Sequence, residues 1–233
     1  MSNRLKFISL PILSFIILFW PHISASEVVN EKIALTGALY NAQEAFGPLV
    51  HFNTQLFVDL DDVPQAYVFI LCNPQNPVLN MVVTDDEILS GFLSDYEKFG
   101  IVTAVAGANK SHVPVIQMYR GLPDYIINSI KIKKTITEKT SKENWKVMRY
   151  LYPAPLELWL EFKNPNSNDI LFVRTSDMEI MDSDLMEELR YSTRRARTFN
   201  SDRERSERIK KKWDFVENLH INQTSERFDR LRK

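Results

Sequence analysis

Residues 66–72 read AYVFILC, an unbroken apolar run that leads into the polar turn NPQNP at 73–77. A short apolar run bounded by turn residues is typical of a strand that is buried on both faces. The sequence becomes apolar again at 78–84 (VLNMVVT), and a five-residue connection between two such runs predicts a β-hairpin. Before this region, residues 50–60 (VHFNTQLFVDL) alternate between apolar and polar, which predicts a further strand.

Similar signals continue along the chain and predict a mainly antiparallel sheet. The further predicted strands are 99–107, 113–119, 156–162 and 169–175. Residues 129–144 (SIKIKKTITEKTSKEN) alternate between apolar and charged and then become wholly polar. This pattern predicts an edge strand that leads into an exposed loop.

An amphipathic helix is predicted at 27–46, ahead of the sheet, and Gly47 and Pro48 end it. Gly37 lies within this segment and weakens its helical character. A helix that precedes a run of strands predicts an α+β domain over residues 26–182, with the helix packed on one side of the sheet.

Residues 183–233 form a segment of different character, which we call the C-terminal tail. Asp182, Ser183 and Asp184 are suited to cap a helix. The apolar residues of the tail recur at helical spacing and are Leu185, Leu189, Ala196, Phe199, Ile209, Trp213, Val216 and Leu219. The polar stretch at 200–202 divides them, so the tail is predicted to be one amphipathic helix or two.

The charges of the two parts differ in sign. Residues 26–182 carry 13 Lys and Arg against 20 Asp and Glu, whereas residues 183–233 carry 14 against 10. A basic tail is typical of proteins that bind an anionic polymer or membrane surface, but it is equally typical of a helix docked on an acidic surface, including one of its own chain. The candidate contact residues are Arg194, Arg195, Arg197, Arg208, Lys211, Lys212 and Trp213.

The first 25 residues have the features of a secretory signal peptide. Arg4 and Lys6 supply positive charge, residues 7–20 are uncharged and mostly apolar, and Ala25 is a small residue at the expected cleavage point. The apolar core is shorter than the roughly 20 residues that span a bilayer, although retention as an anchor is the alternative. We therefore expect a secreted or extracytoplasmic mature protein.

The residue types needed for catalysis or metal binding are sparse. Cys72 is the only cysteine, which excludes a disulfide within the chain. After removal of the signal, His51, His112 and His220 are the only histidines, and none has a metal-ligand spacing. We expect no enzyme activity, cofactor or metal, no nucleic-acid partner, and a buried rather than nucleophilic Cys72.

The order of the segments resembles the N-terminal propeptide of secreted bacterial cysteine peptidases, of the streptopain-like and related papain-fold kinds. The segments that carry the resemblance are AYVFILCNP (66–74), VVT (82–84), FGIVTAVAGANKSHVPVIQMYRGLP (99–123), RYLYPAPLELWLEF (149–162), an Asp-Ile-Leu-Phe-Val strand, and a basic helix with Lys212 and Trp213. It covers about residues 27–182, with the following helix as a further candidate part.

No peptidase domain follows these segments in the sequence, so the family's catalytic Cys and His have no counterparts to carry over. The resemblance therefore implies a stand-alone propeptide-like protein that inhibits or chaperones a separate secreted cysteine peptidase. The alternative is a cell-envelope protein whose basic tail binds anionic wall polymer or a membrane surface.

Overall fold

The computed structural model describes residues 27–75, 100–154, 157–199 and 203–231. The predicted signal peptide and the predicted strand at 78–84 lie outside these ranges. Across the described residues, none of the helices is long and apolar enough to span a lipid bilayer.

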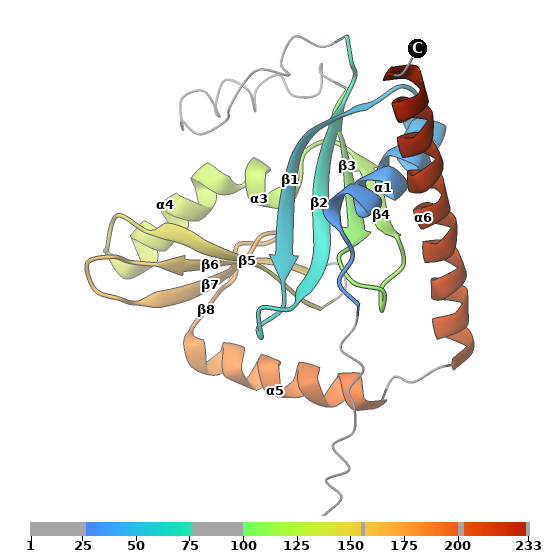
Figure 1. Cartoon of the computed structure of the whole chain (residues 1–233). Helices are drawn as coiled ribbons and strands as arrows, with labels where there is room; N and C mark the ends of the chain where they lie inside the picture. Colours follow the sequence, from blue (N-terminus) through green and yellow to red (C-terminus); the bar gives the residue numbers. More distant parts are fainter. Residues whose placement is uncertain (1–26, 76–99, 155–156, 200–202, 232–233) are drawn as a thin grey trace, which may run out of the picture.

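An eight-stranded, mostly antiparallel sheet forms the centre of the protein, with the order β4-β3-β2-β1-β5-β6-β7-β8 (Figure 1). The strands are β1 Val50–Val58, β2 Pro64–Cys72, β3 Val102–Gly107, β4 Val115–Arg120, β5 Lys146–Ala154, β6 Glu157–Lys163, β7 Ile170–Arg174 and β8 Ile180–Met181. Two antiparallel meanders, β1–β4 and β5–β8, meet where Val58 of β1 pairs in parallel with Leu151 of β5. The predicted α+β class and antiparallel sheet are confirmed.

The central strand β2 is buried along almost its whole length, as its apolar sequence predicts. Its side chains alternate between two cores: Phe69 belongs to the cluster beneath α1, and Val68 to the cluster on the opposite face. The predicted partner strand at 78–84 lies outside the described residues; among those described, β1 pairs with one edge of β2 and β3 with the other.

The N-terminal helix is confirmed as α1, Glu31–Phe46. Asn30 caps it, because the Asn30 side chain accepts a hydrogen bond from the backbone N–H of Lys32 at 2.9 Å. Gly37, which weakened the helical pattern, lies where another helix approaches closely. A Cβ at this position would lie 3.1 Å from both methyl carbons of Val216, so glycine permits the approach.

The predicted edge strand at 129–144 is wrong, because residues Ser129–Thr140 form helix α4. Ile132 and Ile136 lie one helical turn apart and are both fully buried. The alternation of isoleucine and lysine fits a strand as well as a helix. The helix forms because Ile132 and Ile136, four residues apart, are buried together against side chains of the sheet. A short helix, α3 (Asp124–Ile127), precedes α4.

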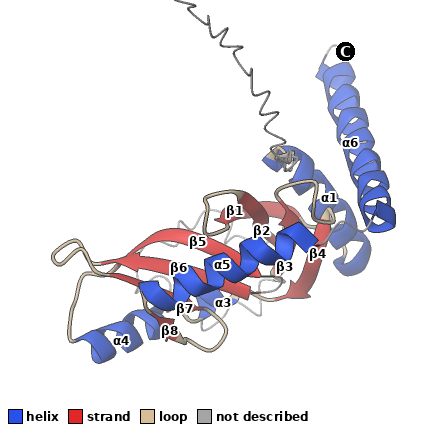
Figure 2. Ribbon diagram, turned by 90° about the horizontal axis from the view of Figure 1, so that it is seen from below, coloured by secondary structure: helices blue, strands red, loops and turns tan. Residues whose placement is uncertain are grey.

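The C-terminal tail forms two helices, α5 (Ser183–Phe199) and α6 (Arg203–Leu231). Asp182 begins α5, as predicted, by accepting hydrogen bonds from the N–H groups of Asp184 and Leu185, both at 3.1 Å. Helix α5 lies across the second meander, where Met186 is buried, and α6 lies beside α1 (Figures 1 and 2). The tail therefore contributes to the same hydrophobic cores as the sheet.

Candidate interaction groove between the helices and the edge of the sheet

Trp213 fixes helix α6 to the body of the protein. Its side chain is fully buried, and its indole Nε1 donates a hydrogen bond to the backbone carbonyl of His112 at 2.7 Å. Ile209 and Val216 lie on the same stripe of α6 and are also buried. This stripe packs on α1 and on the first meander, so the apolar residues of α6 are used within the chain.

Polar contacts at the margin hold α6 in register with α1. Thr36 donates from Oγ1 to the carbonyl of Lys32, and its oxygen accepts from Nδ1 of His220 on α6 at 2.8 Å. Lys110 bridges Glu217 of α6, at 2.8 Å, and Glu27, at 3.0 Å. Hydrogen bonds from these two carboxylates raise the pKa of Lys110.

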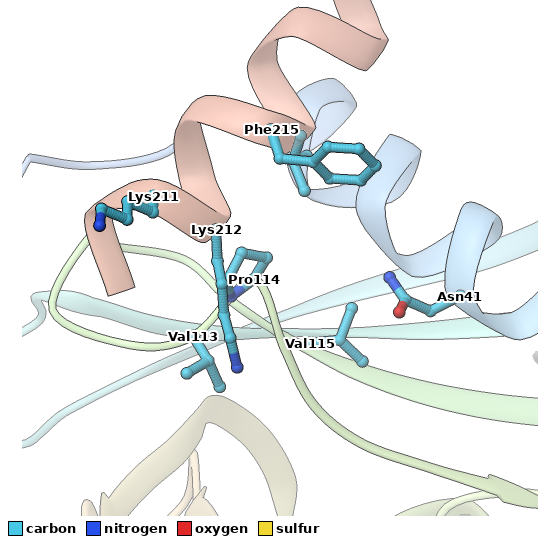
Figure 3. A pocket seen from close by; sticks show the side chains of 8 residues that line it. Asn41, Val113, Pro114, Val115, Lys211, Lys212 and Phe215 are labelled. Carbon is cyan, nitrogen blue, oxygen red and sulfur yellow. The ribbon is translucent and has the colours of Figure 1, made fainter. Parts of the chain in front are cut away.

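Beside this contact lies a groove of about 340 Å³, which we call the α6 groove. It is lined by Asn41, Val113, Pro114, Val115, Lys211, Lys212, Phe215 and Val216. Figure 3 shows Lys212 extending across it towards Val113, while Lys211 points to one side. Phe215 forms part of its wall and contacts Tyr40 edge to face, with the ring centroids 5.6 Å apart. Three separate segments thus build one surface.

The α6 groove combines an apolar floor with two cations. Lys211 and Lys212 are exposed, and neither has an ion-pair partner in the part of the chain that the structure describes. An ammonium group offers three hydrogen-bond donors and pairs with carboxylates or phosphates. The groove is therefore suited to a group that places an anion next to an apolar surface.

The predicted tail contacts are divided by the structure. Arg208, Lys211 and Lys212 are exposed on α6, and Arg208 lies 3.8 Å from Glu204. Trp213 packs inside its own chain, which agrees with the alternative of a docked helix and excludes its side chain as a contact for a partner. The side chains of Arg194, Arg195 and Arg197 in α5 lie outside the described part of the structure.

A second pocket, of about 270 Å³, is lined by residues of both meanders, and we call it the tyrosine pocket. Its lining residues are Val105, Gln117, Tyr119, Asp124, Tyr152, Leu158, Thr175 and Ser176. Burial raises the pKa of Tyr119 to about 12, and burial also raises the pKa of the Asp124 carboxyl. Tyr119 is half-buried in this pocket, whereas Asp124 is exposed at its rim.

A buried polar network supports the loop that carries Val113 and Pro114. Asp59 accepts from Gln65 Nε2 at 2.8 Å, and Gln65 Oε1 lies 2.9 Å from Nε2 of His112. Asn109 donates to the carbonyl of Pro64 at 2.6 Å and is almost completely buried. The Asn109 side chain is therefore enclosed in the folded protein, whereas Ser111, two residues on, is exposed.

The residues weighed for catalysis have structural partners. Cys72 is buried at the end of β2, its Sγ lies 3.9 Å from the carbonyl of Val50, and burial raises its pKa, which favours the neutral thiol. His51 hydrogen-bonds to Thr54 at 2.7 Å. Within the described ranges, no three His, Cys, Asp or Glu side chains come together in an arrangement that could hold a metal ion.

Sequence reasoning missed most of the α6 groove. Asn41, Pro114 and Phe215 carry no motif that marks them as site residues. Their juxtaposition depends on the docking of α6 against α1, which periodicity does not specify.

Comparison of the chain with protein-family models, with curated proteins and with solved structures found no match.

Proposed function

We propose that this chain is an exported binding protein without catalytic activity, and that its partner is a secreted cysteine peptidase, which it inhibits or helps to fold. The observation that carries the proposal is the α6 groove, where Lys211 and Lys212, which have no ion-pair partner among the described residues, stand beside an apolar floor. A site that exposes cations and apolar atoms together is suited to a protein surface that offers a carboxylate beside an apolar side chain.

The anchoring of α6 supports this use of the groove. Trp213 and the His220–Thr36 hydrogen bond fix the helix on the body of the protein, so the lysines project from a rigid element. Little conformational entropy is then lost in α6 when a partner binds, which favours affinity. The choice of a cysteine peptidase rests on the resemblance of residues 27–182 to peptidase propeptides.

The test uses the mature protein, residues 26–233, and the secreted cysteine peptidases of the organism that produces it. We expect binding and inhibition by the wild type and at least a tenfold weaker affinity for the double variant Lys211→Glu/Lys212→Glu. The matched control is Lys131→Glu/Lys139→Glu, which reverses two exposed charges on α4, away from the groove. If every peptidase stays fully active and unbound, the proposal is wrong.

A second candidate function is attachment to an anionic envelope surface, and the exposed row of Arg208, Lys210, Lys211 and Lys212 favours it. Because the apolar stripe of α6 is buried in the protein, such attachment would be electrostatic and would weaken steeply with salt. Sedimentation with phosphatidylglycerol vesicles or with teichoic acid, at low and high salt, tests it. Equal binding to zwitterionic phosphatidylcholine vesicles would exclude this function.

A further inference from the structure

Strand β4 ends the sheet. It pairs with β3 along one edge, from Val102 opposite Arg120 to Ala106 opposite Val115. Among the described residues, no strand lies along its other edge. An unpaired strand edge carries N–H and C=O groups that can pair with an added extended segment.

The two pockets lie on opposite faces of the sheet at this edge. Val115, at the start of β4, lines the α6 groove, on the face covered by α1 and α6. Gln117 and Tyr119 line the tyrosine pocket, on the face that carries α3 and α4. The neighbouring strand β3 has the same division, because Ala104 belongs to the first core and Val105 to the second.

The charges of the two pockets are opposite. Lys211 and Lys212 border the α6 groove, whereas Asp124 lies in the tyrosine pocket. The structure gives Asp124 no cationic partner among the residues it describes. The side chains of Tyr119 and Tyr152 border the same pocket, and aromatic rings can cover the stem of a lysine or arginine or contact its charge.

We propose that β4 binds an extended segment of the partner protein, which adds to the sheet as a ninth strand. Successive side chains of a strand point to opposite faces. The segment therefore presents an acidic side chain to Lys211 and Lys212 and, on its other face, a basic side chain to Asp124. This inference rests on the proposed binding function and specifies which part of the partner is recognised.

Hydrogen exchange measured by NMR on the wild-type mature protein tests the edge itself. In an antiparallel pair, alternate N–H groups of an edge strand point away from its neighbour. We expect those of β4 to exchange rapidly in the free protein and to become protected when a segment binds. Protection in the free monomer would mean that another part of this chain covers the edge, and would overturn the inference.

A displayed library of random dodecapeptides, selected on the immobilised mature protein, supplies the probe. We expect enriched peptides that contain an acidic and a basic residue on opposite faces of the strand, so that their sequence positions differ by an odd number, such as i and i+1 or i and i+3. The variant Lys211→Glu/Lys212→Glu should lose at least tenfold in affinity for these peptides, and Asp124→Lys should do the same. The control Lys131→Glu/Lys139→Glu should bind as the wild type does. Enrichment that ignores the charge reversals would overturn the inference.

Other occupants of the edge give distinct results. Pairing of β4 with a second copy would produce a dimer in sedimentation and protection of β4 that increases with protein concentration, and would overturn the inference. If a peptidase binds while β4 stays unprotected and Asp124→Lys has no effect, the inference fails and the proposed function stands. If selected peptides show the charge pattern but no peptidase binds, only the choice of partner fails.

Discussion

The indole Nε1 of Trp213 donates a hydrogen bond to the backbone carbonyl of His112, across a distance of 2.7 Å. The two residues lie far apart in the sequence, one in α6 and the other in the loop before β4. The contact joins the C-terminal helix to the loop that forms the floor of the α6 groove. The same side chain is fully buried among residues of α1 and the sheet, so it contributes both packing and a polar link.

We expect Trp213→Ala to lower the free energy of unfolding by about 3–5 kcal/mol, because it removes a large buried side chain and leaves the His112 carbonyl unpaired. Trp213→Phe retains much of the packing, and we expect it to cost about 1–3 kcal/mol. Urea denaturation followed by circular dichroism measures both.

Phe215→Ala is the matched control for these variants, because Phe215 lies in the same turn of α6 but is half exposed. We expect its cost to remain below that of Trp213→Phe. A Trp213→Ala variant as stable as the wild type would show that α6 is not fixed as the structure describes.

The close contact between Gly37 and Val216 gives a second prediction. A leucine at position 37 has no space, because even a Cβ would lie 3.1 Å from the methyl groups of Val216. We expect Gly37→Leu to destabilise the protein by about 1–3 kcal/mol, the usual cost of overpacking. We expect the double variant Gly37→Leu/Val216→Ala to be more stable than the sum of the single effects predicts, because the smaller residue provides space. If the changes in unfolding free energy of the two single variants simply add in the double variant, residues 37 and 216 are not in contact and the prediction is wrong.

Much of the fold could be predicted from local sequence patterns. The apolar run at 66–72 and the alternation at 50–60 become β2 and β1, and Asp182 caps a helix as predicted. These features depend on residues that are close in the sequence, where burial periodicity and capping chemistry act directly. Helix α4 was missed because the placement of Ile132 and Ile136 fits two periods, and only the tertiary contacts decide between them.

The site could not be predicted in the same way. Lys211 and Lys212 were identified from charge alone, but their neighbours Val113 and Asn41 come from other segments. The two meanders are joined by one parallel strand pair, Val58 with Leu151, and by a shared hydrophobic core, and neither leaves a local sequence signal. Removal of residues 183–233 would also expose the core beneath Trp213, so charge reversal is the cleaner test of the tail.

The turn between β7 and β8 gives a pH-dependent prediction. Arg174 donates hydrogen bonds from Nε to Oδ1 of Asp177, at 3.0 Å, and from Nη2 to Oδ2, at 2.7 Å. These hydrogen bonds lower the pKa of Asp177 to about 2. Since the folded-state pKa lies below the unfolded value of about 3.9, the ionised Asp177 stabilises the protein above pH 4. That contribution is lost as the pH falls from about 4 through about 2.

We therefore expect Asp177→Asn to be less stable than the wild type at neutral pH, by a small amount because the pair is solvent-exposed. The difference should shrink as the pH falls from about 4 to about 2 and vanish below that. Unfolding by urea at a series of pH values measures it. A difference that stays constant down to pH 2 would show that the Asp177 charge does not contribute.

Cys72 gives the last prediction, which tests the proposal that the protein has no catalytic activity. A catalytic thiol is exposed and has a lowered pKa, whereas burial shields the thiol of Cys72 and raises its pKa. We expect 5,5′-dithiobis(2-nitrobenzoic acid) to leave Cys72 unmodified in the native protein at neutral pH. In about 6 M guanidinium chloride, which unfolds even hyperstable domains, the same reagent should modify Cys72 stoichiometrically. Cys72→Ala should leave the proposed inhibition of a peptidase unchanged. Rapid modification of the native protein would instead identify Cys72 as a reactive thiol and reopen the assignment of a non-catalytic role.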